Sequence, residues 1–330
     1  MASAKTLRQL IKSGVEGNRD LFMKLTEQVI EEERIKQHHL LANDLERILY
    51  GRANIIVEKT MIKEKVPEDR ERGIKLIDLR DPLRRLEDLV LSDENASLID
   101  GIIVEHRRSE TIRKHGLFPV DRLLFCGPSG CGKTLTAEVI ASELGLPFAI
   151  VRIDSVISSF LGETAANLRK VFDFISIAPM VVLFDEFDAL AKERSDIAEH
   201  GEIKRVVNAV LQMMDGYNGK SLLIAATNHE YILDSAIWRR FDEVVVFELP
   251  NTEQIKRLLQ VKLRGIRREF DIDDLRIAGL FKGMSHADVE RVLRRAIKDM
   301  FLSGKEFLHE RHLLQAIQRE DARANRINRR

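Results

Sequence analysis

The first 50 residues carry apolar side chains at helical spacing. These residues recur three and four positions apart in two stripes: Leu21, Phe22, Leu25, Val29 and Ile30, and then Leu41, Leu45, Ile48 and Leu49. A polar break at 37–39 separates the stripes, and Gly14 and Gly17 interrupt a shorter helical stretch before them. This spacing predicts a bundle of two or three amphipathic helices over 1–50. Such a bundle is too small to be very stable alone.

The next stretch, 51–85, is charged and irregular, with EKTMIKEKVPEDRERG at its centre. A segment with so few apolar residues cannot build a core, so we predict a charged linker, with one short strand at 55–57.

From 86 to 250 short apolar runs alternate with helical stretches. The runs are rich in branched residues and lie at 122–126, 148–152, 181–185, 222–226 and 244–247. This alternation predicts an α/β subdomain over 86–250 in which helices flank a parallel sheet. After Pro250 the pattern is helical, so we predict a C-terminal helical subdomain over 251–330.

Composition narrows the class of protein. The 330 residues are 44% hydrophobic and 32% charged, as expected of a soluble globular protein with more than one domain. Lys plus Arg equals Asp plus Glu at 53 each, which gives no overall attraction to nucleic acid or anionic membrane. No signal peptide is visible, and no apolar run approaches the roughly 20 residues of a transmembrane helix. We therefore expect a cytoplasmic protein.

The two cysteines, Cys126 and Cys131, lie close together without further Cys or His at metal-ligand spacing. This count supports neither a disulfide framework nor a zinc site, so we expect two reduced thiols.

The strongest chemical signal directly follows the predicted strand 122–126 and precedes a helix. It is the phosphate-binding loop pattern Gly127, Pro128, Ser129, Gly130, Cys131, Gly132, Lys133 and Thr134, followed by Leu135. Its glycines allow successive backbone N–H groups to surround phosphates, and the helix directs its positive end at them. We expect residues 127–135 to bind a nucleotide, with Lys133 on the β- and γ-phosphates and the Thr134 hydroxyl on Mg²⁺.

A second motif lies at 181–186, where four apolar residues end in Asp185 and Glu186. A strand ending in two acids is a weak signal alone, but it is strong at this distance after a phosphate loop. We expect Asp185 to hold the Mg²⁺ shell and Glu186 to orient and deprotonate the attacking water.

With both motifs in place, residues 86–319 resemble the AAA+ superfamily, more narrowly the AAA clade that includes katanin, spastin and the membrane-bound AAA proteases. The resemblance implies a P-loop core with a C-terminal helical lid, ATP and Mg²⁺ as ligands, and a homo-oligomer, namely a hexamer. Asn228 matches sensor 1, which contacts the γ-phosphate and water. Arg239 and Arg240 match the arginine-finger segment, which reaches a neighbouring subunit's γ-phosphate. Without the two preceding motifs, Asn228 would be interpreted as a turn residue, and Arg239 and Arg240 as a solvated helix end.

Three further segments resemble family features. Phe160, Leu161 and Gly162 resemble the pore loop that lines a ring's channel, although Phe160 could instead cover the local core. The segment 214–217 resembles an intersubunit signalling segment. His286 and Ala287 lie in a turn that resembles the family's G-x-S-G-A-D sequence beside adenine. His286 stands where the family usually has glycine, so the resemblance does not define how this turn contacts the adenine base.

The favoured function is an ATPase ring that remodels, unfolds or translocates a protein substrate. The alternative is an ATP-driven regulatory or assembly switch that acts on a separate effector, such as a partner protease, without threading. Neutral charge and few aromatics disfavour a nucleic-acid translocase. The helices of 1–50 resemble adaptor modules, including those of small bacterial AAA ATPases that work beside subtilisin-like proteases. We therefore expect them to bind the protein substrate or effector; the chain itself carries no protease motif.

Overall fold

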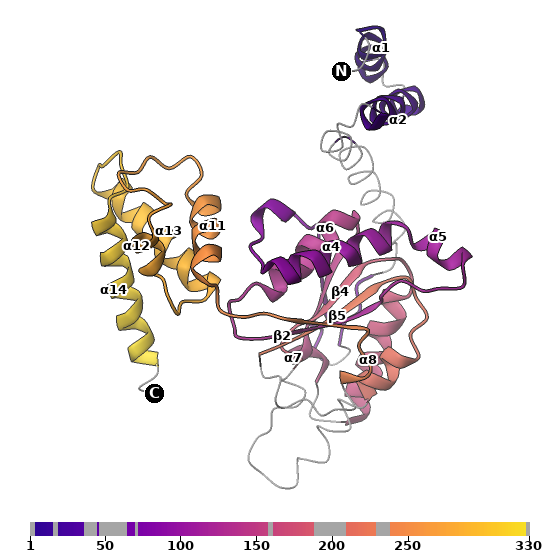
Figure 1. Cartoon of the computed structure of the whole chain (residues 1–330). Helices are drawn as coiled ribbons and strands as arrows, with labels where there is room; N and C mark the ends of the chain where they lie inside the picture. The colour runs from indigo at the N-terminus through magenta and orange to yellow at the C-terminus, as the bar shows by residue number, and fades with distance from the viewer. Residues whose placement is uncertain are drawn as a thin grey trace.

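The computed structural model describes residues 4–15, 19–35, 45, 65–69, 72–157, 161–187, 209–228 and 238–327. Figure 1 shows two N-terminal helices, a central α/β subdomain and a C-terminal group of helices along the chain.

The N-terminal segment is helical, as predicted. Helices α1 (Ala4–Val15) and α2 (Arg19–Ile35) pack against each other, and Ile30 is buried beside Phe22, Met23 and Leu45. The rest of the second apolar stripe and the predicted strand at 55–57 lie outside the described residues.

The central subdomain contains one sheet of six strands in the order β1-β3-β4-β5-β2-β6. The strands are β1 (Ile77–Arg80), β2 (Arg122–Cys126), β3 (Phe148–Val151), β4 (Val181–Phe184), β5 (Leu222–Thr227) and β6 (Glu243–Val246). The five strands from β2 to β6 pair in parallel, as predicted. Every residue of β4 and β5 is buried, which explains their continuous apolar runs.

The linker prediction for 51–85 was wrong at its C-terminal end, where β1 forms the edge of the sheet. β1 pairs antiparallel with β3, and Leu76 and Ile77 are 0% exposed. The preceding segment is also attached, because the Asn167 side chain donates a buried hydrogen bond to Asp69 at 2.7 Å. The strand has only four residues among charged neighbours, so its local pattern gives little signal.

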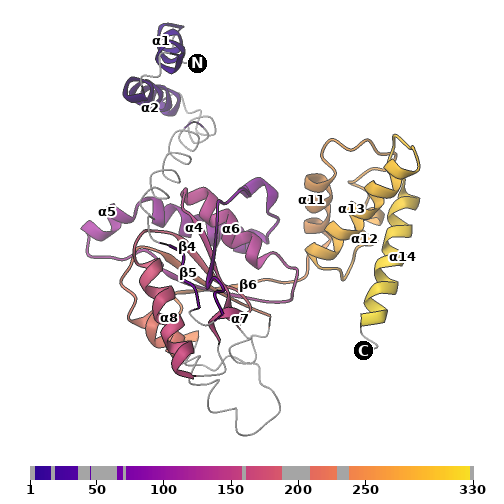
Figure 2. The ribbon, with the colours of Figure 1, turned by 180° about the vertical axis from the view of Figure 1, so that it is seen from behind.

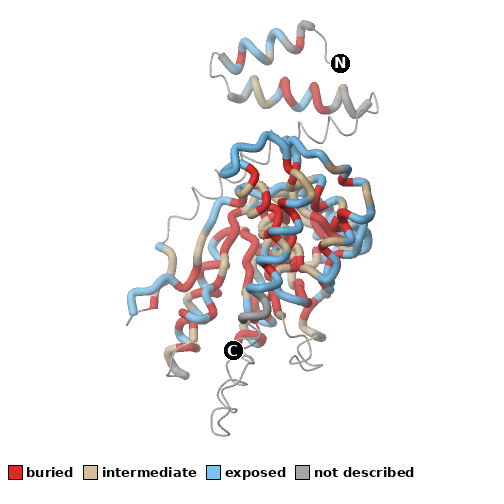
Figure 3. Tube along the Cα trace, turned by 90° about the vertical axis from the view of Figure 1, so that its left-hand side faces the viewer, coloured by how far each residue is buried: buried red, intermediate tan, exposed pale blue. Residues whose placement is uncertain are grey.

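Helices cover both faces of the sheet (Figures 1 and 2). The helices of this subdomain with described bounds are η1 (Leu86–Asp88), α4 (Asp93–Arg107), α5 (Ser109–Lys114), α6 (Lys133–Leu144), α7 (Ile153–Val156) and α8 (Leu161–Ile175). Leu123 and Phe125 of β2 pack with α4 and α6, whereas Leu124 and Cys126 pack with α8. The strand thus fills both cores through the alternation of its side chains. Figure 3 shows many buried residues in the interior of the structure, with exposed residues around them.

The C-terminal subdomain is helical, as predicted, with α11 (Thr252–Lys262), α12 (Leu275–Gly279), α13 (His286–Leu302) and α14 (Glu310–Ile327) around its own apolar cluster. Capping boxes start two of these helices, through Asn251 at α11 and Ser285 at α13. Among the described helices, none combines the length and apolar character needed to span a bilayer.

Candidate functional site

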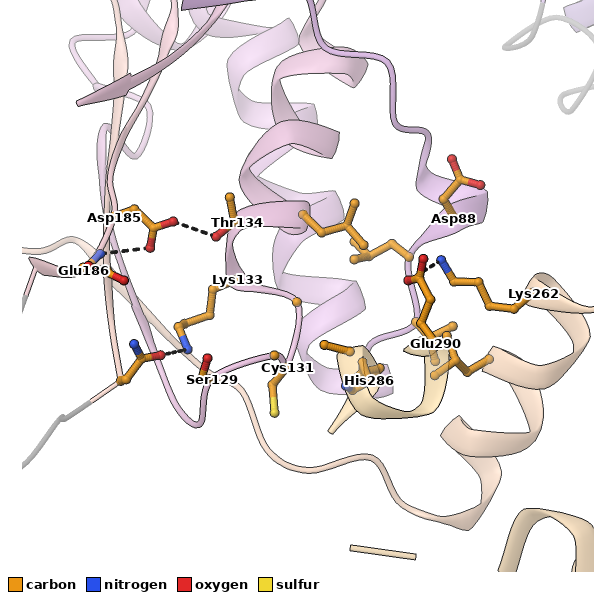
Figure 4. A pocket seen from close by; sticks show the side chains of 18 residues that line it. Asp88, Ser129, Cys131, Lys133, Thr134, Asp185, Glu186, Lys262, His286 and Glu290 are labelled. Carbon is orange, nitrogen blue, oxygen red and sulfur yellow. Dashed lines mark hydrogen bonds and ion pairs between the residues drawn. The ribbon is translucent and has the colours of Figure 1, made fainter. Parts of the chain in front are cut away.

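A cavity of about 330 Å³ lies between the phosphate loop, the ends of β4 and β5, and the helical subdomain (Figure 4). It brings together most of the predicted site residues: Ser129, Gly130, Cys131, Gly132, Lys133, Thr134, Leu135, Asp185, Glu186, Asn228, His286 and Ala287. The carboxyl ends of parallel strands meet at one edge of a sheet, which is why motifs far apart in sequence converge here.

The glycines of the loop are required by its geometry at two positions. Gly127 has φ +135°, and a Cβ there would lie 2.0 Å from the Phe247 carbonyl oxygen. Gly130 has φ +77°, and a Cβ there would lie 2.7 Å from Ser285 Oγ. Both positions combine a left-handed backbone with close approach, so only glycine fits without strain.

Lys133 is buried and donates hydrogen bonds to three oxygens. These are the carbonyls of Gly127 at 2.6 Å and Pro128 at 2.9 Å, and Asn228 Oδ1 at 2.8 Å. The ammonium group is therefore held at the point where the loop meets the end of β5.

The two acids of the second motif lie beside the loop. Thr134 Oγ1 donates to Asp185 Oδ2 at 2.9 Å, and Asp185 Oδ1 accepts from the Glu186 N–H at 2.9 Å. Glu186 has φ +51°, an uncommon conformation for a residue other than glycine. Strained backbone of this kind is concentrated at functional sites, where the surrounding structure holds it in place.

The other end of the cavity contains residues that the sequence analysis did not predict. Asp88, Leu89 and Val90 line one wall, and Leu258, Lys262 and Glu290 contribute from α11 and α13. Their helices show only the apolar periodicity of a packed face, so no chemical motif distinguishes them in the sequence.

Lys262 Nζ and Glu290 Oε2 form an ion pair at 2.9 Å at this end. Burial raises the pKa of Glu290, but hydrogen bonds from Lys262 and Arg294 outweigh it, so the pKa lies below its usual value. The carboxylate is therefore ionised at neutral pH.

The phosphate loop and the helical subdomain are directly hydrogen-bonded, because the Ala287 N–H donates to the Gly130 carbonyl at 3.0 Å. The neighbouring His286 has both ring nitrogens buried, and the Val90 backbone interacts with its ring. Burial lowers the pKa of His286, so its ring is neutral at pH 7.

Of the other predicted residues that the structure describes, Gly127, Pro128, Arg239 and Arg240 do not line the cavity. Arg239 is exposed, and Arg240 Nε pairs with Asp215 Oδ2 at 3.1 Å. Leu161 and Gly162 are the first residues of α8, while Phe160 lies outside the described residues.

A glycine-rich loop between a parallel strand and a helix, with a buried lysine and two acids at the adjacent strand end, defines a P-loop nucleotide-binding protein. Residues 123–249 match the family described as ATPase family associated with various cellular activities (AAA). The chain is also similar to the Uncharacterized AAA family ATPase y4kL of Sinorhizobium fredii (strain NBRC 101917 / NGR234), with 40% identity over 323 residues, covering 98% of this chain and 97% of the relative. The chain belongs to the AAA family of ATPases, and its activity is ATP hydrolysis.

Proposed function

We propose that this chain forms a homo-oligomeric ring, a hexamer, in which Mg²⁺-dependent ATP hydrolysis remodels, unfolds or translocates a protein substrate. One observation carries the proposal: Arg239 and Arg240 do not line the cavity of their own chain. Phosphoryl transfer develops charge on the γ-phosphate that an arginine from a neighbouring subunit can neutralise. A site that receives its arginine in this way requires an assembly.

Within one subunit, the loop N–H groups and Lys133 bind the phosphates, and Asn228 and Glu186 orient the attacking water. Glu186 accepts the proton of that water as it attacks. The donor set fits Mg²⁺, since the Thr134 hydroxyl and Asp185 place oxygen ligands side by side. Mg²⁺ when bound there neutralises charge on the transferring phosphoryl group. Among the described residues, no group of three or more His, Cys, Asp or Glu could hold a metal ion. Phosphate oxygens and water would therefore complete the ligand set.

The base and ribose would occupy the end lined by Val90, Leu258, His286 and Ala287. This end combines apolar side chains with a few polar groups, as small-molecule sites usually do. The hydrogen bond between Ala287 and Gly130 would let the helical subdomain act as a lid whose position depends on the nucleotide.

The segment 160–162 is the proposed pore loop, and the helices of 1–50 are the proposed adaptor for the protein substrate or effector. We extend the ATPase subdomain N-terminally from 86 to include β1, and keep the lid at 251–330. We also propose that the chain is related to katanin, spastin and the AAA proteases. Its proposed location is the cytoplasm, where ATP is abundant. No specific nucleic acid partner is proposed.

A threading test separates this function from the regulatory switch. A destabilised fluorescent domain is fused to the N-terminus, and its fluorescence is followed after addition of ATP. We expect ATP-dependent unfolding by the wild type, and none by Phe160→Ala or Glu186→Gln. Normal ATPase activity without unfolding in the wild type would favour the switch, which changes a bound effector without threading.

A further inference from the structure

One ion pair in the cavity has no part in the phosphate chemistry. Lys262, in the last turn of α11, and Glu290, in α13, both line the end of the cavity away from the phosphate loop (Figure 4). Lys262 Nζ lies 2.9 Å from Glu290 Oε2, and Arg294 donates a hydrogen bond to Glu290 Oε1 at 2.7 Å. The two side chains of the pair are 20% and 34% exposed, so a ligand in the cavity can reach them.

The packing of the lid helices places this pair beside the apolar wall of the cavity. Leu258 and Lys262 are four residues apart on α11, so they lie on one face of that helix. Leu258 is buried in the same apolar cluster as Val289, which directly precedes Glu290. Leu258 and Val90 supply the apolar surface that suits a planar base, and the ion pair adds charged groups at the same end.

The Glu290 carboxylate, which is ionised at neutral pH, can accept further hydrogen bonds. An ionised carboxylate has about four lone-pair positions and no donor. Lys262 and Arg294 occupy one position on each oxygen. The carboxylate can therefore accept about two more hydrogen bonds, and only from a ligand group that donates them.

We propose that the pair of Lys262 and Glu290 recognises the ribose of the nucleotide. Glu290 accepts hydrogen bonds from the 2′- and 3′-hydroxyls, and Lys262 orients the carboxylate and donates to a hydroxyl oxygen. This inference rests on the proposed function, in which the base and ribose occupy this end of the cavity. Two adjacent hydroxyls match the free acceptor positions, and an acidic side chain binds a ribose hydroxyl in the same way in dinucleotide-binding proteins.

The edge of a base would be a poorer ligand for this pair. Adenine presents a donor at N6 and an acceptor at N1, whereas guanine presents an acceptor at O6 and a donor at N1. An ammonium beside a carboxylate can bind either edge, so the pair would not select ATP over GTP. A hydroxyl is a donor and an acceptor at once, so it can donate to Glu290 and accept from Lys262. The ion pair therefore fits the ribose better than the base.

The test measures the dissociation constants of the full chain for ADP, 2′-deoxy-ADP and 3′-deoxy-ADP by calorimetry. ADP carries the same nucleoside as ATP and is not hydrolysed, so the measurement does not depend on turnover. The variants are Glu290→Gln, Glu290→Ala, Lys262→Met, Lys262→Arg and Asp88→Asn, the last at the acid that η1 contributes to this end. Glu306→Gln is the matched control, because Glu306 is a lid glutamate that pairs with Arg267 at 3.4 Å and does not line the cavity. Circular dichroism shows whether each variant is folded.

We expect the wild type and Glu306→Gln to bind ADP on the order of 10-fold more tightly than either deoxy analogue, as expected for a hydrogen bond to a charged group. Glu290→Ala should bind all three nucleotides with nearly equal affinity, because the acceptor is lost. Glu290→Gln should retain part of the preference, since its amide oxygen still accepts. Lys262→Met should lower the preference, and Lys262→Arg should retain it, because arginine also pairs with a carboxylate.

Equal affinity of the wild type for ADP and both deoxy analogues would overturn the inference, and so would a preference that Asp88→Asn removes and Glu290→Ala does not. Inosine diphosphate, which lacks the exocyclic amine, tests a contact with the base. If Glu290→Ala changes the preference for ADP over inosine diphosphate but not over the deoxy analogues, the pair binds the base and the inference is wrong. These results leave the proposed ring untouched. Conversely, failure of mixed subunits to restore hydrolysis, with the ribose preference intact, would contradict the proposed function and not this inference.

Discussion

Lys133 Nζ lies 2.8 Å from Asn228 Oδ1, which joins the phosphate loop after β2 to the end of β5. The two strands are neighbours, with Cys126 opposite Thr227, so residues far apart in sequence meet at one edge of the sheet. The contact places a cation and a polar amide together at the point where we propose that the γ-phosphate binds.

Replacement of Lys133 should abolish nucleotide binding. Lys133→Ala removes the buried ammonium that we propose binds the β- and γ-phosphates, whereas Lys282→Ala changes an exposed lid lysine and serves as the control. Titration with a fluorescent ATP analogue measures the nucleotide affinity of both variants. Equal affinity in the wild type and Lys133→Ala would contradict the assigned role.

Glu186→Gln should retain binding and stop turnover. The amide keeps the shape of the side chain but cannot accept the proton, and loss of a general base typically costs about 10²- to 10⁴-fold in rate. Glu253→Gln, at an exposed position in α11, is the control. Phosphate release and ATP binding are measured on the same preparation, and rapid turnover by Glu186→Gln would exclude Glu186 as the base.

Contact between the loop and the lid is tested by a pair of glycine variants. Alanine is strained at both Gly130 and Gly132, where φ is +77° and +101°. A Cβ meets Ser285 and Ala287 only at Gly130, while at Gly132 it meets open space. We therefore expect Gly130→Ala to lower ATP affinity and melting temperature more than Gly132→Ala. Equal effects would show that backbone strain alone matters and that the lid contact is unimportant.

The N-terminal boundary is tested by two truncations. A chain that starts at Lys65 keeps β1 and Asp69, so it should fold, bind ATP and assemble, but lose capture of the partner. A chain that starts at Asp81 lacks the buried Leu76 and Ile77, each of which contributes about 2–5 kcal/mol by comparison with core truncations. It should fail to fold, as judged by cooperative thermal melting. Loss of assembly by the chain that starts at Lys65 would show that the removed N-terminal segment is an oligomerisation element.

Patterns among residues that are close in the sequence predicted the parallel strands and the phosphate loop. The parallel strands carry continuous branched runs because both faces of the sheet are covered, and the phosphate loop is a contiguous motif. β1 was missed because its stability comes from pairing with β3, which no local pattern in a charged segment reveals. The ion pairs of Lys262 with Glu290 and Arg240 with Asp215 join distant residues, so only the tertiary structure identifies them.

The central claim is that each ATPase site is completed by a neighbouring subunit, and mixing two inactive variants tests it most directly. Arg239→Ala retains Glu186, and Glu186→Gln retains Arg239, so some interfaces of a mixed ring contain both. ATPase activity should rise on mixing and peak near equal proportions. Native mass spectrometry confirms that mixed assemblies have formed. If such assemblies hydrolyse ATP no faster than either variant alone, the site is not shared between subunits.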